Sequence, residues 1–212
     1  MRVAILLNLI VLQFCYAQCY DCNGPAGLCH VEHCVSPVFL ARAVSYALSH
    51  YPELKEVDIK FKYRNIKTTM QTRPDLKSLF PKGHRQYTVW VDNYCENHNG
   101  IVICEVPDHA WTGLIGHELA HIVCFEKMSN KQLAWYGLRY LNRHYHRKFE
   151  RETDKVAIAH GLGAELLDWS AYVSSASSAN DAYRKFKMRY YMHPEEILGE
   201  FIPGLLQSSP AR

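Results

Sequence analysis

The sequence predicts an α+β fold, in which helices pack on one side of a small antiparallel or mixed sheet. Three observations favour this fold: a helical pattern comes first, short stretches of strand-like alternation follow, and the second half of the chain is almost entirely helical in pattern. Hydrophobic residues make up 48% of the 212 residues and charged residues 21%, so the chain can bury a full core.

Residues 1–17 are typical of a signal peptide. Met1-Arg2 gives a positive start, and the apolar run from Val3 to Phe14 is too short to span a bilayer as a helix. Cys15-Tyr16-Ala17 resembles a small-x-small cleavage site, so we expect cleavage after Ala17. An uncleaved anchor and lipidation at Cys15 are the alternatives. We therefore expect a secreted or periplasmic protein without stable membrane insertion.

Residues 18–36 form a cysteine-rich lead before the main domain. Export to an oxidising compartment favours disulfides within it, and its four cysteines allow three pairings. A structural zinc helped by His30 or His33, or an inhibitory thiolate on a catalytic metal, are the alternatives. Further along, Cys95 and Cys104 can staple a hairpin, while Cys124 is left over. The four cysteines of the lead are Cys19, Cys22, Cys29 and Cys34.

The main domain is expected to span residues 37–205 and to begin with a helix. Ser36-Pro37 is typical of an N-cap followed by proline at the first helical position. Apolar residues recur on one face as far as about His50, and Pro52 ends the pattern.

Three strands are predicted after this helix. Apolar and polar residues alternate over residues 57–64 and again over 86–92, and an irregular loop over 67–85 is expected between them. A third strand over residues 101–106 follows the turn signal Asn99-Gly100.

The rest of the chain is predicted to be helical. Pro107-Asp108 starts the first of these helices, Gly161 and Gly163 interrupt the pattern, and the chain after Pro203, including a tail over residues 206–212, is expected to be loose. The predicted helical stretches are residues 110–127, residues 131–159, a stretch ending near residue 174, residues 180–191, and a stretch starting at His193-Pro194.

The formal net charge is +3, from 24 Lys or Arg and 21 Asp or Glu residues. This balance does not favour nucleic acid or an anionic membrane surface as a partner. One basic cluster is interpreted as the solvated face of a strand: Lys60, Lys62, Arg64 and Lys67.

His117 and His121 lie four residues apart in an apolar helical stretch. Residues at this spacing share a helix face, so both imidazoles can reach one Zn²⁺ at about 2.0–2.1 Å. Glu118 follows the first histidine and can take a proton from a metal-activated water. Two core histidines with backbone partners are the structural alternative.

A zinc site needs a third protein ligand, and the next long helical stretch offers one. Glu150 and Asp154 share a face there, so Glu150 can complete the metal shell while Asp154 orients a ligand histidine. Glu152 is an alternative ligand, as are His144 and His146 in a three-histidine site. An ordinary exposed charged stretch is the structural alternative.

His117-Glu118-x-x-His121 followed by Glu150-x-x-x-Asp154 resembles the gluzincin branch of zinc metallopeptidases. The resemblance covers about residues 112–169. It implies a zincin-like fold in which the active-site helix carries the His-Glu-x-x-His motif. It also implies roles for five residues: His117, His121 and Glu150 as zinc ligands, Glu118 as general base and Asp154 in the second shell.

Gluzincin-like folds also suggest where a substrate would bind, because an edge strand beside the metal helix pairs with an extended peptide. Residues 86–92 are the candidate strand, with Trp90 near the cleft, and a plain sheet strand is the alternative. Tyr191 and His193 are candidate donors to the transition state, with His160 and Tyr190 as further candidates.

The sequence therefore predicts a secreted zinc metalloendopeptidase that hydrolyses peptide bonds in a peptide or protein substrate. Glu118 is the expected base towards the metal-activated water. The alternative is a disulfide-stapled secreted binding or inhibitory protein, in which the metal site is non-catalytic or absent.

Overall fold

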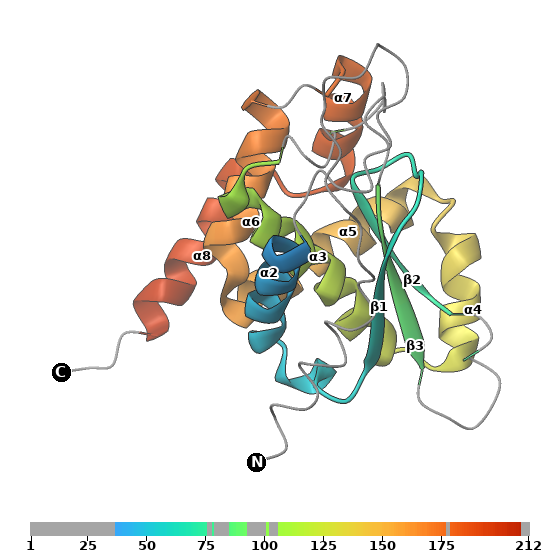
Figure 1. The fold of residues 1–212 in the computed structure, drawn as a ribbon. Coiled ribbons are helices and arrows are strands. Elements are labelled where there is room, and N and C mark those ends of the chain that lie inside the picture. The colour runs from blue at the N-terminus through green and yellow to red at the C-terminus, as the bar shows by residue number, and fades with distance from the viewer. Residues whose placement is uncertain are drawn as a thin grey trace, which may run out of the picture.

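The computed structural model describes residues 37–75, 78, 85–92, 101, 106–176 and 179–208 (Figure 1). The predicted signal peptide, the cysteine-rich lead and the interior of the predicted third strand lie outside these residues. Cys124 is the one cysteine that the described residues include, and it is free. None of the described helices has the length and apolar character needed to cross a membrane.

The strands form a three-stranded mixed sheet, and most of the helices lie on one side of it in the view of Figure 1. Its strands are β1 (Asp58–Tyr63), β2 (Met70–Pro74) and β3 (Gln86–Val91), in the order β1-β3-β2. β1 runs parallel to β3, and β2 runs antiparallel to it. The fold is thus mostly helical with a small mixed sheet, which agrees with the prediction at this level of detail.

β2 lies inside the segment that was predicted to be an irregular loop. It has only five residues, and the last of them is a proline. Since only Met70 and Thr72 are buried, the alternation of buried and exposed residues is too short to be recognised in the sequence. Pairing with β3 makes this segment a strand, with Thr72 opposite Val89. The loop prediction is therefore wrong over these residues.

The expectation that residues 86–92 form an edge strand is also wrong. β3 is hydrogen-bonded to β1 on one side and to β2 on the other, so its backbone cannot take up an added peptide strand. In the described sheet, β1 and β2 are the edge strands.

The helices confirm most of the predicted pattern. α3 is central and packs against α2, α5, α6 and β2, and 14 of its 19 residues are buried. Short 3-10 or π-helical turns occur at Pro52–Leu54, Ile158–Leu162 and Tyr172–Ala176. The α-helices are α2 (Pro37–Ser49), α3 (Asp108–Glu126), α4 (Asn130–Arg139), α5 (Arg143–Ala157), α6 (Gly163–Ala171), α7 (Asp181–Tyr190) and α8 (Pro194–Ser208).

The single helix predicted over residues 131–159 is two helices, α4 and α5. The side chain of Asn142 accepts hydrogen bonds from the backbone N–H groups of His144 and Tyr145, which makes it the N-cap of α5. The break turns the chain at Tyr140, so that α5 runs alongside α3. Asparagine favours caps over helix interiors, but one asparagine in a helical pattern does not by itself predict a break.

The predicted interruption at Gly161 is confirmed, because this residue has a φ of 83° between α5 and α6. Gly163, in contrast, starts α6 rather than ending a helix. The chain is also helical beyond Pro203, since α8 continues to Ser208 where a loose tail was expected.

Candidate metal centre

α3 places both histidines of the His-Glu-x-x-His segment on one face in the interior of the protein. Their four-residue spacing brings the two ring centroids to 4.7 Å, and His117 and His121 are only 3% and 7% exposed. The helix is held in place by fully buried apolar side chains around them: Ile115, Leu119 and Ile122.

α5 brings Glu150 to the two histidines. Its Oε2 atom lies 3.2 Å from Nε2 of His117 and 3.4 Å from Nε2 of His121, and the residue is 1% exposed. The three donor atoms lie within 4.8 Å of one another. The structure thus brings together a candidate metal-binding triad, made of the three residues that the sequence predicted as ligands.

The two nitrogen–oxygen separations can be compared with those in a zinc site. Two ligands about 2.1 Å from one tetrahedral zinc stand roughly 3.4 Å apart, which is close to both measured nitrogen–oxygen separations. Two imidazole nitrogens and one carboxylate oxygen form a donor set typical of catalytic zinc sites, in which the fourth position is left open.

Further hydrogen bonds orient the two imidazoles. Nδ1 of His117 lies 2.8 Å from Oδ1 of Asp154, the residue that was predicted to orient one of the ligand histidines. Nδ1 of His121 lies 3.3 Å from Oγ1 of Thr153, whose hydroxyl donates to the carbonyl of Phe149. The hydroxyl can then accept the Nδ1 proton of His121. Both histidines therefore have a hydrogen-bond partner at Nδ1, and both turn Nε2 towards Oε2 of Glu150.

Thr153 was not among the site residues predicted from the sequence. Its position three residues after Glu150 places it on the same side of α5, and this spacing is the only signal that could have revealed it.

Glu118 supplies a buried carboxylate whose charge acts on Tyr140 and Tyr191, two residues that contact the triad. The residue is 5% exposed, and its Oε2 atom has no hydrogen-bond partner among the described residues. Such an atom is costly to bury and is uncommon in a folded protein. The backbone carbonyl of Glu118 accepts a hydrogen bond from Thr72 at 3.1 Å, which ties this part of α3 to β2.

Two tyrosines lie against the triad. The hydroxyl of Tyr140 donates to Oε1 of Glu150, and the ring of Tyr191 lies 5.3 Å from that of His117. Burial, together with the charges of Glu150, Tyr140 and Glu118, raises the pKa of Tyr191 well above its ordinary value. Its phenol therefore keeps its proton. Tyr140 was not predicted as a site residue, because it lies at the break between α4 and α5 that the sequence pattern did not show.

The carboxylates determine the protonation of the metal-free triad. Burial alone would lower the pKa of His117, but the hydrogen bonds and charges of Asp154 and Glu150 outweigh it and raise this pKa to about 10. Burial would likewise raise the pKa of Glu150, but the charge of His121 and the hydrogen bonds from the surrounding histidines hold it well below its usual range.

Two predicted site residues do not reach the triad. Trp90 lies on the sheet face opposite to that of Tyr87, which stacks on Phe125 of α3, and its ring instead faces the cations of Lys62 and Arg64. His193 uses Nε2 to hydrogen-bond the carbonyl of Met188 at 2.6 Å.

The alternative ligands are also placed elsewhere. Glu152 and His144 are exposed. His160, which was a candidate donor to the transition state, is bonded to Glu53 and to the carbonyl of Val156. His146 comes nearest, with Nε2 3.4 Å from Oε1 of Glu150, but it lies on the side of that carboxylate away from the two ligand histidines.

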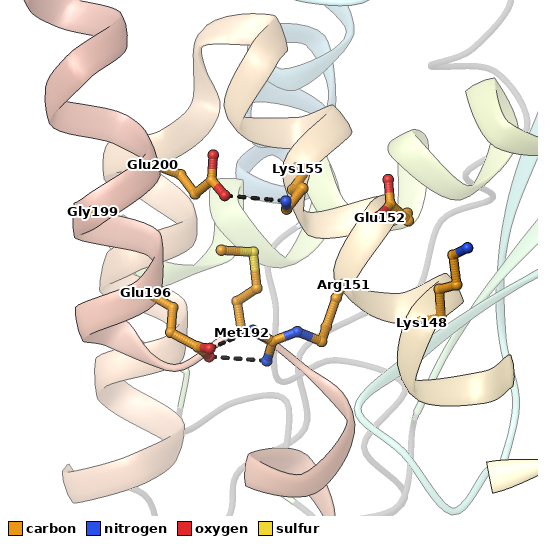
Figure 2. Close-up of a pocket in the computed structure, with 8 residues that line it drawn as sticks. All are labelled: Lys148, Arg151, Glu152, Lys155, Met192, Glu196, Gly199 and Glu200. Carbon is orange, nitrogen blue, oxygen red and sulfur yellow. Dashed lines mark hydrogen bonds and ion pairs between the residues drawn. The ribbon is translucent and has the colours of Figure 1, made fainter. Parts of the chain in front are cut away.

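An open cavity of about 420 Å³ lies between α5 and α8, on the face of α5 turned away from Glu150 (Figure 2). Arg151 spans it, donating to the carboxylate of Glu196 and, at 3.2 Å, to the carbonyl of Tyr191. Lys155 pairs with Glu200 at 3.1 Å. The cavity is lined by Lys148, Arg151, Glu152, Lys155, Met192, Glu196, Gly199 and Glu200.

These contacts connect the cavity to the triad. Arg151 and Glu196 hold the segment between α7 and α8, and the backbone N–H of Met192 in this segment donates to Oδ2 of Asp154 at 2.8 Å. Asp154 is therefore fixed from one side by His117 and from the other by a segment clamped onto α8.

Comparison with protein-family models, with curated proteins and with solved structures found no match for this chain.

Proposed function

We propose that the protein is a zinc-dependent hydrolase of peptide bonds, with His117, His121 and Glu150 as the metal ligands. One observation carries the proposal: three buried donor atoms lie within 4.8 Å of one another, and a buried carboxylate oxygen of the neighbouring Glu118 has no hydrogen-bond partner among the described residues. The resemblance of the motif to gluzincins supports a zincin-like fold as part of the same proposal.

A bound zinc would lower the pKa of water to about 7 and polarise a peptide carbonyl. The residues of the chain have the other roles. Glu118 takes the proton of the attacking water and passes it to the leaving amine nitrogen. Asp154 and Thr153 hold the two imidazoles so that Nε2 of each faces the triad. Tyr191, which keeps its proton, donates to the carbonyl oxygen as negative charge develops there.

An extended peptide substrate would bind along the outer edge of β2. This strand lies next to α3, through the hydrogen bond from Thr72 to the carbonyl of Glu118, and pairs only with β3 in the described sheet. An extended peptide added at its other edge would lie along the metal helix. Since Tyr140 and Tyr191 contact the triad, entry of a peptide requires one of these side chains to move aside. Export, as predicted from residues 1–17, would place this activity outside the cytoplasm.

Metal content per chain tests the ligand assignment. We expect about one zinc in the purified wild type and a sharp loss in Glu150→Gln. Glu152→Gln is the matched control, because Glu152 is exposed on the same helix and lines the cavity between α5 and α8. A folded wild type without zinc would contradict the proposal, as would equal zinc in both variants.

Glu118→Gln tests catalysis separately from metal binding. It should keep its zinc and its circular dichroism spectrum while hydrolysis of an unstructured protein such as casein falls by about 10²–10⁴-fold. Zinc retained with no hydrolysis in the wild type would indicate a structural metal site and support the alternative of a binding protein.

A further inference from the structure

One face of α4 is apolar and exposed. Trp135 and Leu138 are each 62% exposed, and Leu141, in the turn after the helix, is 81% exposed. The three follow one another at steps of three residues, so they lie along one side of this segment. Single exposed leucines are ordinary, but an exposed tryptophan aligned with two leucines is a contiguous patch.

α4 meets the rest of the protein through its other side. Leu133 is its one buried residue, and Tyr136 packs edge-on against Phe125 at 5.0 Å. Arg85 anchors the start of the helix, donating to Asn130 and to the carbonyl of Phe125, each at 2.7 Å. Figure 1 shows α4 at the periphery of the fold, beyond the sheet. Its outer side is therefore held in place and open to solvent.

The sequence around this face is strongly basic. No Asp or Glu occurs between Glu126 and Glu150, although the whole chain has a net charge of only +3. The guanidinium of Arg139 on α4 lies 4.5 Å from the ring centroid of Tyr145 on α5, so the basic residues of the two helices lie close together. Six exposed cations occur in this interval: Lys127, Lys131, Arg139, Arg143, Arg147 and Lys148.

We propose that this apolar and basic face, made of Trp135, Leu138 and Leu141 with Lys131 and Arg139, binds the surface of an anionic lipid bilayer. Tryptophan and leucine on a helix lying in the membrane plane enter the boundary between headgroups and acyl chains. Lys131 and Arg139, four residues before and after Trp135, can extend their long side chains to the lipid phosphates.

The shape of the face favours a bilayer over a protein partner. The apolar side chains project from the outside of a helix and do not line the cavity between α5 and α8, which would be the place for an anchor residue of a partner. Leu141 follows Tyr140, whose hydroxyl donates to Glu150, and a docked bilayer would therefore lie beside the candidate metal centre. The proposal does not depend on that centre being catalytic.

Sedimentation with lipid vesicles tests the proposal. The full mature chain is expected to bind vesicles of phosphatidylglycerol mixed with phosphatidylcholine, and to bind phosphatidylcholine alone at least about tenfold more weakly. High salt should weaken the binding, because the charge on the headgroups is then screened.

Two double variants and two matched controls locate the surface. Trp135→Ala with Leu138→Ser, and Lys131→Glu with Arg139→Glu, should each reduce binding at least about tenfold. Leu198→Ser, an exposed leucine on α8, and Lys55→Glu, an exposed lysine beyond α2, should bind like the wild type. Zinc content should be the same in all of them.

Three results would overturn the proposal. They are no binding to anionic vesicles by the folded wild type, an equal loss in the control variants, and binding of this face to an acidic protein or RNA without binding to vesicles.

Discussion

Asp154 joins three parts of the fold through one carboxylate. Oδ1 lies 2.8 Å from Nδ1 of His117 on α3, and Oδ2 accepts the backbone N–H of Met192 at 2.8 Å. Because Asp154 belongs to α5, the orientation of a ligand histidine is linked to the segment between α7 and α8.

Asp154→Asn should weaken zinc binding by about 10–100-fold, since the neutral amide holds the His117 imidazole less well and makes it a poorer ligand. Competition with a chelator of known affinity measures the change. Asp168→Asn, on the exposed side of α6, is the control and should leave the affinity unchanged. Unchanged affinity in Asp154→Asn would contradict the assigned role.

Zinc binding should release protons at neutral pH. Despite the opposing effect of burial, Asp154 and Glu150 raise the pKa of His117 to about 10 in the metal-free protein, so this histidine is protonated at pH 7. A zinc ligand nitrogen must be unprotonated, and the proton therefore leaves on binding. Titration calorimetry in buffers with different ionisation enthalpies measures the number released. Apparent zinc affinity should rise with pH up to about pH 10, and a binding heat independent of the buffer would contradict this.

Tyr191→Phe should reduce kcat by about 10²–10³-fold without changing zinc content. The reason is that only the hydroxyl is lost, while the ring contact with His117 at 5.3 Å is kept. Peptide hydrolysis at saturating substrate gives kcat directly. Tyr46→Phe removes a hydroxyl from an exposed tyrosine on α2 and should behave like the wild type. A rise in KM with kcat unchanged, or a loss of zinc alone, would assign Tyr191 to binding rather than catalysis.

The contact between Arg151 and Glu196 should stabilise the protein except in strong acid. The hydrogen bond from Arg151 lowers the pKa of Glu196 from 4.5 to about 2. A lowered carboxyl pKa contributes stability that is complete above about pH 4.5 and is lost as the pH falls towards 2. Urea unfolding of wild type and Glu196→Gln should therefore differ at pH 6 and converge near pH 2. Glu195→Gln, at an exposed position, should have the same stability as the wild type at both pH values.

Gly113 allows α3 and α6 to approach closely. A Cβ atom at this position would lie 2.0 Å from the backbone oxygen of Glu165. Gly113→Ala should therefore destabilise the protein by about 1–3 kcal/mol or more, as overpacking does. Gly137 on α4 has open space around its Cβ position, so Gly137→Ala should stabilise by about 0.5–1 kcal/mol. Denaturant unfolding of both variants measures the contrast, and equal effects would contradict the packing argument.

Features that depend on neighbours in the chain were predicted from the sequence. Four-residue spacing places His117 and His121 on one helix face, and it does the same for Glu150 and Asp154, because helix geometry is local. The helices Pro37–Ser49 and Asp108–Glu126 were predicted for the same reason. Strand β2, in contrast, exists through its pairing with β3, and that pairing is not encoded within its own five residues.

The sequence by itself therefore determined which side chains share a helix face, and the resulting ligand candidates. Only the tertiary structure decided that Glu150, rather than Glu152 or His146, meets the two histidines, since that depends on how α5 rotates and packs against α3. Tertiary packing also brought Tyr140 to the triad and placed β3 in the middle of the sheet. Periodicity acts over a few residues, whereas these contacts join residues far apart in the chain through burial of a shared core.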